Sequence, residues 1–433
     1  MVHSLNAKWL SPGRFLALGF AAVILLGTLI LLLPVSANPG VNVRPVDALF
    51  TSTSAVCVTG LIAIDTADYF SVFGRFAVAL LIQIGGLGIT SIGVTFIMLA
   101  GRKIGLRERV LVKESLNLDS LKGVVRLVKA IILMTLCFEF IGMALSYIVF
   151  SKDYPPLAAL GISAFHSVAA FNNSGFDILG NYQSLIHYRD NVLLNLTTCG
   201  LIIFGGLGFY TIREILQKRS LHKLSMNSKI VLLMTTSLLA VGTVLLKLTD
   251  NVTWLGAFFQ STSARTAGFS TYNLGSFTAA GQFILILLMF IGASPGSTGG
   301  GIKTTTAFTL IRGIFSFATN RGCTAFRRKI PGESIMKAFL ITTLALGLVC
   351  VNTLLICVAE PKLTFMQVLF EVVSGFGTVG LSTGITPYLT DFSKLVLCLT
   401  MFVGRLGPLT IACIWSYQPA SHISYVEERV TIG

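Results

Sequence analysis

Apolar segments long enough to cross a bilayer recur along the chain, and each successive pair encloses a shorter, half-polar stretch. A hydrocarbon core needs about 20 apolar residues in helical form. Eight segments meet or approach that length: 14–33, 73–100, 124–150, 191–210, 229–247, 278–293, 335–358 and 393–415. The pattern therefore predicts a span, a short helix with a loop, and a second span, repeated four times along the chain.

The four half-polar stretches share one internal spacing. In each, a phenylalanine precedes a glycine by ten residues: Phe50 and Gly60, Phe165 and Gly175, Phe258 and Gly268, Phe370 and Gly380. Small and hydroxyl residues fill the interval, and an apolar residue follows every glycine. Because a fixed spacing marks internal repeats, we divide the chain into four pore repeats, 1–110, 111–225, 226–330 and 331–433, the last ending in a short C-terminal tail.

Composition and charge place these repeats in a membrane. The chain is 54% hydrophobic and only 12% charged, about half the charged fraction of a soluble protein. We therefore expect an all-α polytopic membrane protein with eight spans in a pseudo-fourfold arrangement around one pore. The net charge of +14 comes mainly from basic residues in 101–129, 211–229 and 303–337. By the positive-inside rule these loops and both termini are cytoplasmic, so the charge does not indicate nucleic-acid binding. Recognition of lipids or nucleotides by the basic loops stays an alternative.

Each half-polar stretch ends in a short motif whose backbone could bind a cation. Irregular backbone persists at membrane depth only where it is buried in protein or lines a wet cavity. Glycine tolerates the positive φ that turns carbonyls toward one axis, and rings of carbonyls can replace the hydration shell of potassium. The motifs lie near 57–60, 172–175, 265–268 and 377–380. The predicted potassium-binding filter residues are Val58, Thr59, Gly60, Asn173, Ser174, Gly175, Thr266, Ala267, Gly268, Thr378, Val379 and Gly380.

A glycine-rich run in the third repeat predicts a gate. Residues 292–301 contain five glycines and one proline, a composition that cannot continue a stable helix. The run nearly reads as a nucleotide-binding P-loop, but Ile302 separates the last glycine from Lys303, and a span rather than a strand precedes it. We therefore expect a gating loop over 292–303. The candidate gate residues are Gly292, Ser294, Gly296, Gly299, Gly300, Gly301, Lys303 and Arg405.

Several polar residues in apolar surroundings have two interpretations. Arg405 is a cation inside an apolar span, which is costly and usually functional. It fits either a gate or a structural partner of Glu371 or of loop carbonyls. Asp47 is expected to cap the first short helix, Glu139 to be a buried hydrogen-bonded group, and Arg265 to brace the third filter motif. His166 is expected to pack. The scattered acids and histidines form no catalytic constellation, so we predict no enzyme activity and no cofactor.

The four motifs together carry a family resemblance. The segments CVTGL, NNSGF, RTAGF and TVGLS, with the glycine-rich run and the segment Gly404–Pro408, resemble the Trk/Ktr/HKT superfamily of potassium transporters over essentially the whole chain. The closest likeness is to the KtrB membrane subunit of bacterial Ktr systems. The resemblance implies potassium uptake across the bacterial plasma (inner) membrane by a homodimer with one pore per subunit. It also implies an obstructing intramembrane loop, sodium stimulation, and regulation by a cytosolic nucleotide-binding ring of KtrA-like subunits.

Two other function classes are weighed against this interpretation. An ion-coupled secondary transporter for another solute would be built from inverted repeats around a charged midplane site, whereas the repeats here all run in the same direction. An intramembrane enzyme would need paired catalytic groups at membrane depth. Channel-like flow and sodium-coupled transport both remain compatible with the sequence.

Overall fold

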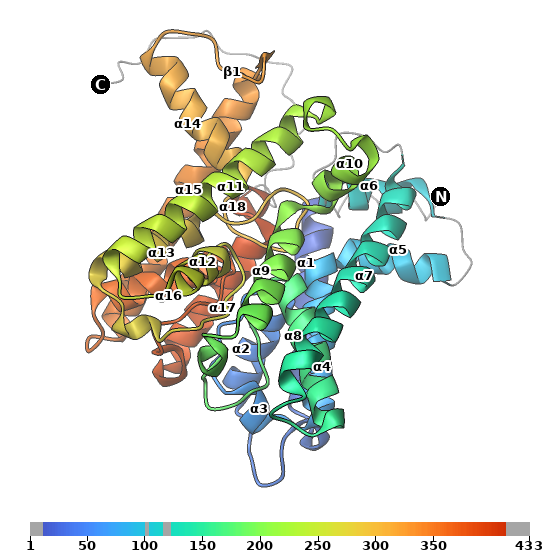
Figure 1. Cartoon of the computed structure of the whole chain (residues 1–433), viewed down its shortest axis with the longest axis vertical. Coiled ribbons are helices and arrows are strands. Elements are labelled where there is room, and N and C mark those ends of the chain that lie inside the picture. The colour runs from blue at the N-terminus through green and yellow to red at the C-terminus, as the bar shows by residue number, and fades with distance from the viewer. Residues whose placement is uncertain (1–11, 100–103, 116–122, 413–433) are drawn as a thin grey trace, which may run out of the picture.

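The computed structural model describes residues 12–99, 104–115 and 123–412, and most of these residues are helical. The predicted C-terminal tail and both chain ends lie outside this range. Figure 1 shows the helices side by side in one body, with the α14 end projecting from it. The order of the elements within each predicted repeat is a long helix, a short helix, and a second helix followed by a further segment.

The first two repeats have matching elements. The first contains α1 (Pro12–Leu31), α2 (Pro45–Val56), α3 (Thr66–Tyr69), α4 (Val72–Leu87) and α5 (Ile89–Leu99). The next helices are α6 (Leu106–Ser115), α7 (Val124–Phe150), α8 (Pro156–Phe171), α9 (Val192–Leu207) and α10 (Phe209–Lys218). The short helices α2 and α8 therefore occupy the predicted positions ahead of their filter motifs.

The third and fourth repeats follow the same order. The third contains α11 (Met226–Thr249), α12 (Trp254–Ser263), α13 (Ala279–Phe290) and α14 (Thr304–Ala318), and the strands β1 (Thr324–Ala325) and β2 (Arg328–Lys329) form an antiparallel hairpin after it. The fourth contains α15 (Gly332–Ala359), α16 (Phe365–Gly377), α17 (Asp391–Leu406) and α18 (Pro408–Ala412). All four short helices are therefore present.

The long helix of a repeat approaches its short helix at a glycine. A Cβ at Gly27, Gly142 or Gly242 would lie 2.4–2.5 Å from a serine Oγ on the short helix of the same repeat. These serines donate hydrogen bonds back to carbonyls of the long helix, from Ser52 to Ile24, from Ser167 to Glu139 and from Ser261 to Leu239. Small residues permit such close packing of helices in membranes.

In the first, second and fourth repeats the second helix is not the straight span that the sequence predicted. Within 73–100 the chain bends by 98° between α4 and α5, and within 191–210 by 95° between α9 and α10. Gly88 and Gly208 stand at these breaks with φ of +81° and +86°, and Gly407 ends α17 with φ of +90°. A positive φ cannot continue a right-handed helix, so the predicted uninterrupted helices were wrong at these positions.

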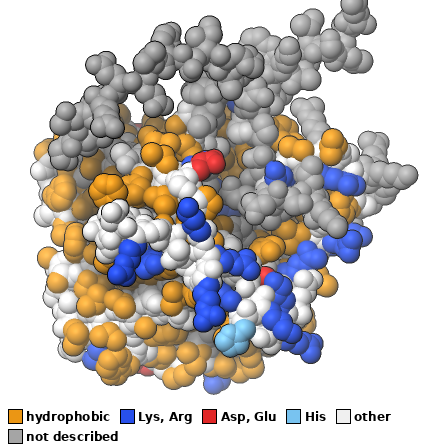
Figure 2. Space-filling view, turned by 90° about the horizontal axis from the view of Figure 1, so that it is seen from above, with side chains coloured by type: hydrophobic (Ala, Val, Ile, Leu, Met, Phe, Trp, Pro, Cys, Tyr) orange, Lys and Arg blue, Asp and Glu red, His pale blue; other side chains and the backbone are white. Residues whose placement is uncertain are grey.

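The outer surface fits a bilayer. By length and apolarity, α1, α11 and α15 can each cross a membrane unaided, while the pairs α4 with α5 and α9 with α10 meet that test only as bent spans. Large apolar side chains such as Leu25, Leu133 and Leu354 are more than half exposed on the long helices. Figure 2 shows Lys and Arg side chains gathered on the face above α10 and α14, where the predicted cytoplasmic loops 211–229 and 303–337 lie.

Candidate ion pathway

The four filter motifs adopt the same unusual backbone. The residue two positions before each glycine is left-handed: φ is 56° at Val58, 57° at Asn173, 82° at Thr266 and 49° at Thr378. The glycines themselves have φ of 87°, 71°, 84° and 93°. Left-handed residues that alternate with ordinary ones turn successive peptide groups toward the same side of the chain. Only the glycines were predicted to be left-handed from the sequence.

These motifs meet in a closed ring. A Cβ placed on Gly60 would lie 2.1 Å from the carbonyl oxygen of Ser174, and one on Gly380 would lie 2.1 Å from that of Thr59. A Cβ placed on Gly175 would lie 2.7 Å from the carbonyl oxygen of Ala267, and one placed on Gly268 would lie 2.4 Å from that of Val379. Each contact joins one repeat to the next and the fourth joins the first, so any side chain at these glycines would intrude on a neighbouring carbonyl.

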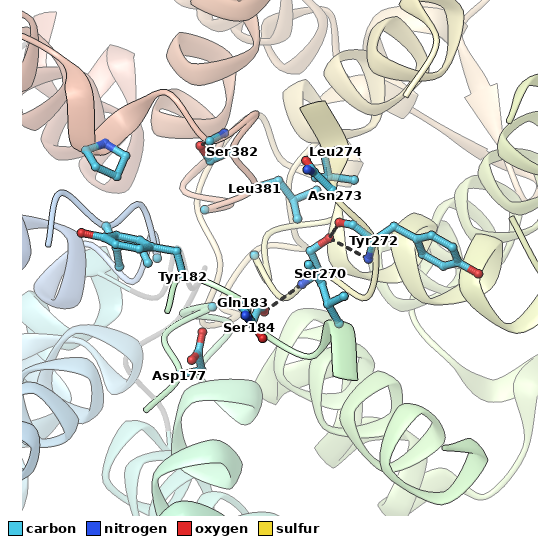
Figure 3. Close-up of a pocket in the computed structure, with 18 of the residues that line it drawn as sticks. Asp177, Tyr182, Gln183, Ser184, Ser270, Tyr272, Asn273, Leu274, Leu381 and Ser382 are labelled. Carbon is cyan, nitrogen blue, oxygen red and sulfur yellow. Dashed lines mark hydrogen bonds between the residues drawn. The ribbon is translucent and has the colours of Figure 1, made fainter. Parts of the chain in front are cut away.

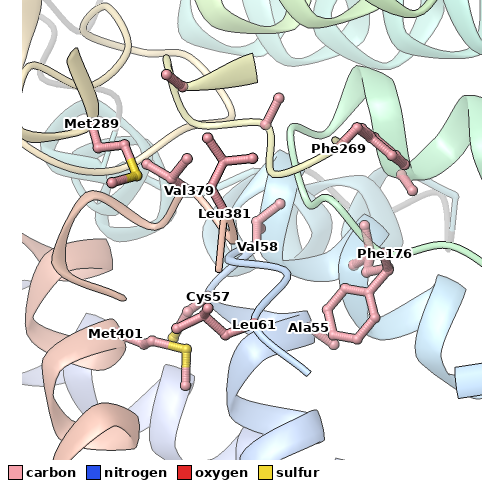
Figure 4. Packing of buried hydrophobic residues seen from close by; sticks show 14 of the residues in the cluster. Ala55, Cys57, Val58, Leu61, Phe176, Phe269, Met289, Val379, Leu381 and Met401 are labelled. Atoms are coloured by element: carbon pink, nitrogen blue, oxygen red, sulfur yellow. The ribbon is translucent and has the colours of Figure 1, made fainter. Parts of the chain in front are cut away.

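Buried side chains hold this ring from outside. The apolar residue after each glycine, Leu61, Phe176, Phe269 or Leu381, is at most 1% exposed, and Figure 4 shows all four around the filter segments. Hydroxyl groups add a second anchor. The amides of Gly60 and Gly380 donate to Ser54 Oγ and Ser374 Oγ at 3.0 and 3.1 Å. The backbone of the ring is therefore held in place by buried apolar contacts and by hydrogen bonds to serine hydroxyls.

An open cavity of about 440 Å³ lies on one side of the ring. All four filter glycines line it, together with residues from the loops that follow them. Figure 3 shows Asp177, Ser270 and Ser382 on three of these loops around the cavity.

The glycine-rich loop between α13 and α14 closes the opposite side of the ring. Gly300 N donates to Thr378 Oγ1 at 2.9 Å, and a Cβ on Gly299 would lie 2.2 Å from Thr266 Oγ1. Thr266 and Thr378 are the left-handed residues that precede the filter glycines. The loop therefore lies directly against the end of the ring that faces away from the open cavity.

Arg405 and Lys303 hold the loop in that place. The Arg405 guanidinium donates to the carbonyl of Thr298 in the loop and to the carbonyl of Gly85 at the end of α4. Lys303 Nζ donates to the Gly299 carbonyl at 2.7 Å. Because the loop carbonyls accept from two cations, its irregular backbone is satisfied without regular secondary structure.

The other candidate gate residues belong to the same assembly. Ser294 N donates to the carbonyl of Gly206 at 3.0 Å, and the Gly296 carbonyl accepts from Phe209 N at 3.0 Å. A Cβ on Gly292 would lie 2.1 Å from the carbonyl oxygen of Gly300 within the loop, and one on Gly301 would lie 3.2 Å from Gly377 Cα. A second cavity of about 270 Å³ lies on the far side of the loop, lined by Gly299, Gly301, Lys303 and Arg405 among others. The loop thus separates two cavities, and the structure brings all predicted gate residues together around it.

Comparisons with known proteins agree with this architecture. Residues 19–423 match the family model of TrkH, described as cation transport protein. The chain belongs to the TrkH family of cation transport proteins. It is 36% identical to the Ktr system potassium uptake protein B of Bacillus subtilis and 36% identical to the potassium/sodium uptake protein NtpJ of Enterococcus hirae, with 98% of both chains covered in each case.

A solved structure shares the fold. The potassium transporter TrkH from Vibrio parahaemolyticus superposes with a TM-score of 0.74 at 19% identity, covering 95% of this chain and 86% of that one. The predicted family and the predicted fold class, a polytopic helical membrane protein with pore-helix repeats, are thereby confirmed. Because the family transports cations, this TrkH-family chain is a transporter and not an enzyme. The repeat boundaries and the roles of the site residues stay predictions.

The structure of this TrkH-family chain decides two of the sequence-based interpretations of polar residues. Asp47 does not cap α2. The residue at the N-cap position is Arg44, which makes no side-chain capping hydrogen bond. Its carboxylate is 7% exposed and pairs with Lys394 Nζ of α17 at 2.8 Å and with Arg44. Glu371 does not pair with Arg405. It accepts from Ser382 Oγ at 2.6 Å and from Thr386 Oγ1 at 2.8 Å in the loop after the fourth filter motif.

Glu139 and His166 lie where the sequence suggested. Glu139 is 8% exposed, and its Oε1 accepts from Asn172 Nδ2 at 3.0 Å, which ties the second filter segment to α7. His166 packs edge-on against Phe150 and Phe269 and shares a hydrogen bond of 2.9 Å with Thr198. Both are buried, hydrogen-bonded groups away from the cavities described above.

Arg265 is buried directly before the third filter motif. Its Nη1 donates to the Thr235 carbonyl at 3.5 Å, and its Nε has no partner among the described residues. Sequence reasoning missed Lys394, which is 5% exposed beside Asp47. The available signal was a lysine inside the predicted span 393–415, because a cation there requires a partner.

Proposed function

We propose that this chain carries potassium into the cell through the ring formed by its four filter motifs. The observation that carries the proposal is the closed cycle of contacts between each filter glycine and the carbonyl of the next repeat. Rings of backbone carbonyls can replace the hydration shell of potassium. The relatives named above as potassium or potassium/sodium uptake proteins cover nearly the whole chain.

The short helices suit this role. The helices α2, α8, α12 and α16 each end immediately before a filter motif. A helix C-terminus carries about half a negative charge, so four of them would contribute about two negative charges at the ring. A cation can therefore be stabilised there by dipoles and carbonyls, with no carboxylate inside the ring.

The loop 292–303 is proposed to be the gate. It lies against Thr266 and Thr378 at the inner end of the ring, between the two cavities, where ions leaving the filter would pass. Arg405 and Lys303 would hold the closed position through its carbonyls. Opening would require the loop to move aside and these hydrogen bonds to be exchanged for others.

Regulation and assembly form a separate part of the proposal. One relative is named as protein B of a Ktr system, which supports a partner subunit. We propose a homodimer in the bacterial plasma membrane, with both termini in the cytoplasm, that docks a KtrA-like nucleotide-binding ring on the basic face of Figure 2. Sodium stimulation is supported by the relative named as a potassium/sodium uptake protein.

Ion flux into liposomes that contain the purified full chain tests the proposal. We expect rubidium and potassium to enter faster than sodium, and an inward sodium gradient should not be required for that uptake. Equal rates for the three ions, or flux no greater than in protein-free liposomes under all conditions, would contradict it. A strict requirement for sodium would instead assign the chain to sodium-coupled transport.

A further inference from the structure

The loop 292–303 is docked on the break between α9 and α10. Ser294 N in the loop donates to the carbonyl of Gly206 near the end of α9 at 3.0 Å. Phe209 N, the first amide of α10, donates to the carbonyl of Gly296 in the loop at 3.0 Å. The first amides of a helix have no partner within the helix, so the loop and α10 satisfy each other. The start of α10 is therefore bound directly to the loop.

This docking distinguishes the break in the second repeat from the other two. A Cβ placed on Gly208, between α9 and α10, would lie 2.5 Å from the carbonyl oxygen of Pro295 in the loop. At Gly88 no atom lies within 4 Å of the corresponding position, and at Gly407 the nearest atom is Thr410 Oγ1 in α18, 3.8 Å away. Among these three breaks, only the one ahead of α10 has a carbonyl of the loop against its glycine.

The body of α10 is held by a buried carboxylate. Glu214 is 6% exposed and accepts from Ser225 N at 3.0 Å and from Ser225 Oγ at 2.7 Å. It also accepts from Ser228 Oγ and from Lys218 Nζ. Ser225 is the N-cap of α11, and Figure 1 shows α10 beside the start of that helix. Glu214 therefore ties α10 to the first turn of the third repeat.

The tie and the loop contact lie on one short helix. Phe209 and Glu214 are less than two helical turns apart, and a hydrogen-bonded helix of that length moves as a unit. A displacement of α10 from the start of α11 must therefore also move the amide of Phe209 that binds the loop. The residues 216–223 that follow are exposed or half-buried, on the side of the predicted cytoplasmic loops.

We propose that Glu214 is a positioning residue for the gate: it fixes α10, and through the first turn of α10 it keeps the loop 292–303 across the ion path. The inference rests on the proposed function, which assigns the gate to that loop. Release of Glu214 from the start of α11 should free α10 and loosen the loop without any change in the filter. A partner that binds the segment 216–223 would act on the gate by the same route.

Hydrogen–deuterium exchange of the full chain in detergent tests the connection itself. We expect Glu214→Ala to speed amide exchange in 292–303 about 10-fold, since one hydrogen bond to a charged acceptor changes an equilibrium by roughly that factor. Glu360→Ala is the matched control. Glu360 also accepts from one backbone amide and two hydroxyls, those of Thr390 and Ser393, but at the start of α17. This control should leave exchange in 292–303 unchanged.

Rubidium flux into liposomes that contain the same variants tests the consequence for the gate. We expect Glu214→Ala to raise partner-free flux about 5-fold or more, with an unchanged preference for rubidium over sodium. A merely structural defect would lower flux or ion preference instead. Ser228→Ala removes one bond to the same carboxylate from the α11 side and keeps Glu214 itself. It should raise flux less, by about 3-fold, and it tests the inference even where Glu214→Ala does not fold.

The two measurements separate failure of the inference from failure of the proposed function. Unchanged exchange and flux in Glu214→Ala and Ser228→Ala would overturn the inference, and so would equal increases in Glu360→Ala, which would indicate general loosening. Faster exchange without more flux overturns it as well if Arg405→Ala does raise flux. If Arg405→Ala also leaves flux unchanged, the connection exists but the loop is not the gate. Absence of rubidium flux in every form of the chain would contradict the proposed function itself.

Discussion

Arg405 donates a hydrogen bond to the backbone carbonyl of Thr298, so a side chain from the fourth repeat holds the loop of the third. The same guanidinium reaches the carbonyl of Gly85 in the first repeat. An arginine offers five donors in a fixed fork, which allows it to join three segments at once. A residue far from the loop in the sequence therefore contributes to holding it in position.

Removing this connection should open the pathway. We expect Arg405→Ala, or deletion of Ser297 to Gly300, to raise rubidium flux without any partner by about 10-fold or more, because hydrogen bonds to charged groups contribute roughly 1.5 to 3 kcal/mol each. Flux into liposomes measures the effect. Arg75→Ala is the matched control, since Arg75 also donates to backbone carbonyls, those of Phe70 and Ala67, but on the outer side. If both loop variants fold and their partner-free flux is unchanged, the loop is not the gate.

Substitution of the filter glycines should abolish ion preference. A side chain at Gly60 or Gly268 would lie 2.1 or 2.4 Å from a neighbouring carbonyl, so Gly60→Ser and Gly268→Ser must distort the ring. We expect both to lose the preference of rubidium over sodium in flux measurements. Gly40→Ser is the control, because Gly40 also has a positive φ, of 80°, but no atom lies within 4 Å of the position that a Cβ would take there. Wild-type ion preference in the first two variants would argue against the filter assignment.

The ion pair between Asp47 and Lys394 should be important for stability. It joins α2 of the first repeat to α17 of the fourth, with both side chains at most 7% exposed. Removal of one partner of a buried pair typically costs about 3–5 kcal/mol, because the other charge is left uncompensated. We expect Lys394→Met and Asp47→Asn each to lower the thermal unfolding temperature in detergent. The unfolding temperature of the double variant should fall by less than the sum of the two single decreases.

An exposed pair provides the comparison for that experiment. Lys337 and Glu333 are 2.6 Å apart on α15, with exposures of 60% and 78%. Because exposed pairs contribute about 1 kcal/mol or less, Lys337→Met should change the unfolding temperature little. Additive effects of Lys394→Met and Asp47→Asn would show that the two side chains do not interact in the folded protein.

Assembly can be measured directly. The basic face over the loops 211–229 and 303–337, with no regulatory domain in the described part of the chain, motivates the expectation of a dimer that binds a cytosolic subunit. Light scattering of detergent-solubilised protein should give the mass of two chains plus bound detergent, and a nucleotide-binding subunit should co-purify from the native source. A stable monomer with full, regulated flux would contradict both expectations.

The sequence alone determined the membrane class, the four short helices and the positions of the filter glycines. These features follow from local properties: apolar segment length, the spacing of phenylalanine and glycine, and the conformational freedom of glycine. The glycine-rich run at 292–301 likewise predicted an irregular loop, because its composition cannot continue a helix. Each of these inferences needs only residues that are close together in the chain.

The tertiary structure decided which polar groups meet. Asp47 pairs with Lys394 rather than capping its helix, and of the two partners that the sequence left open for Arg405, the structure selects the loop carbonyls and not Glu371. The bend at Gly88 also could not be predicted from the sequence, because a glycine within an apolar segment is compatible with either close helix packing or a helix break. The partners of Asp47 and Arg405 lie 347 and 107 residues away in the sequence. Such choices depend on how the repeats pack in three dimensions, since a buried charge takes whichever partner the fold places within reach.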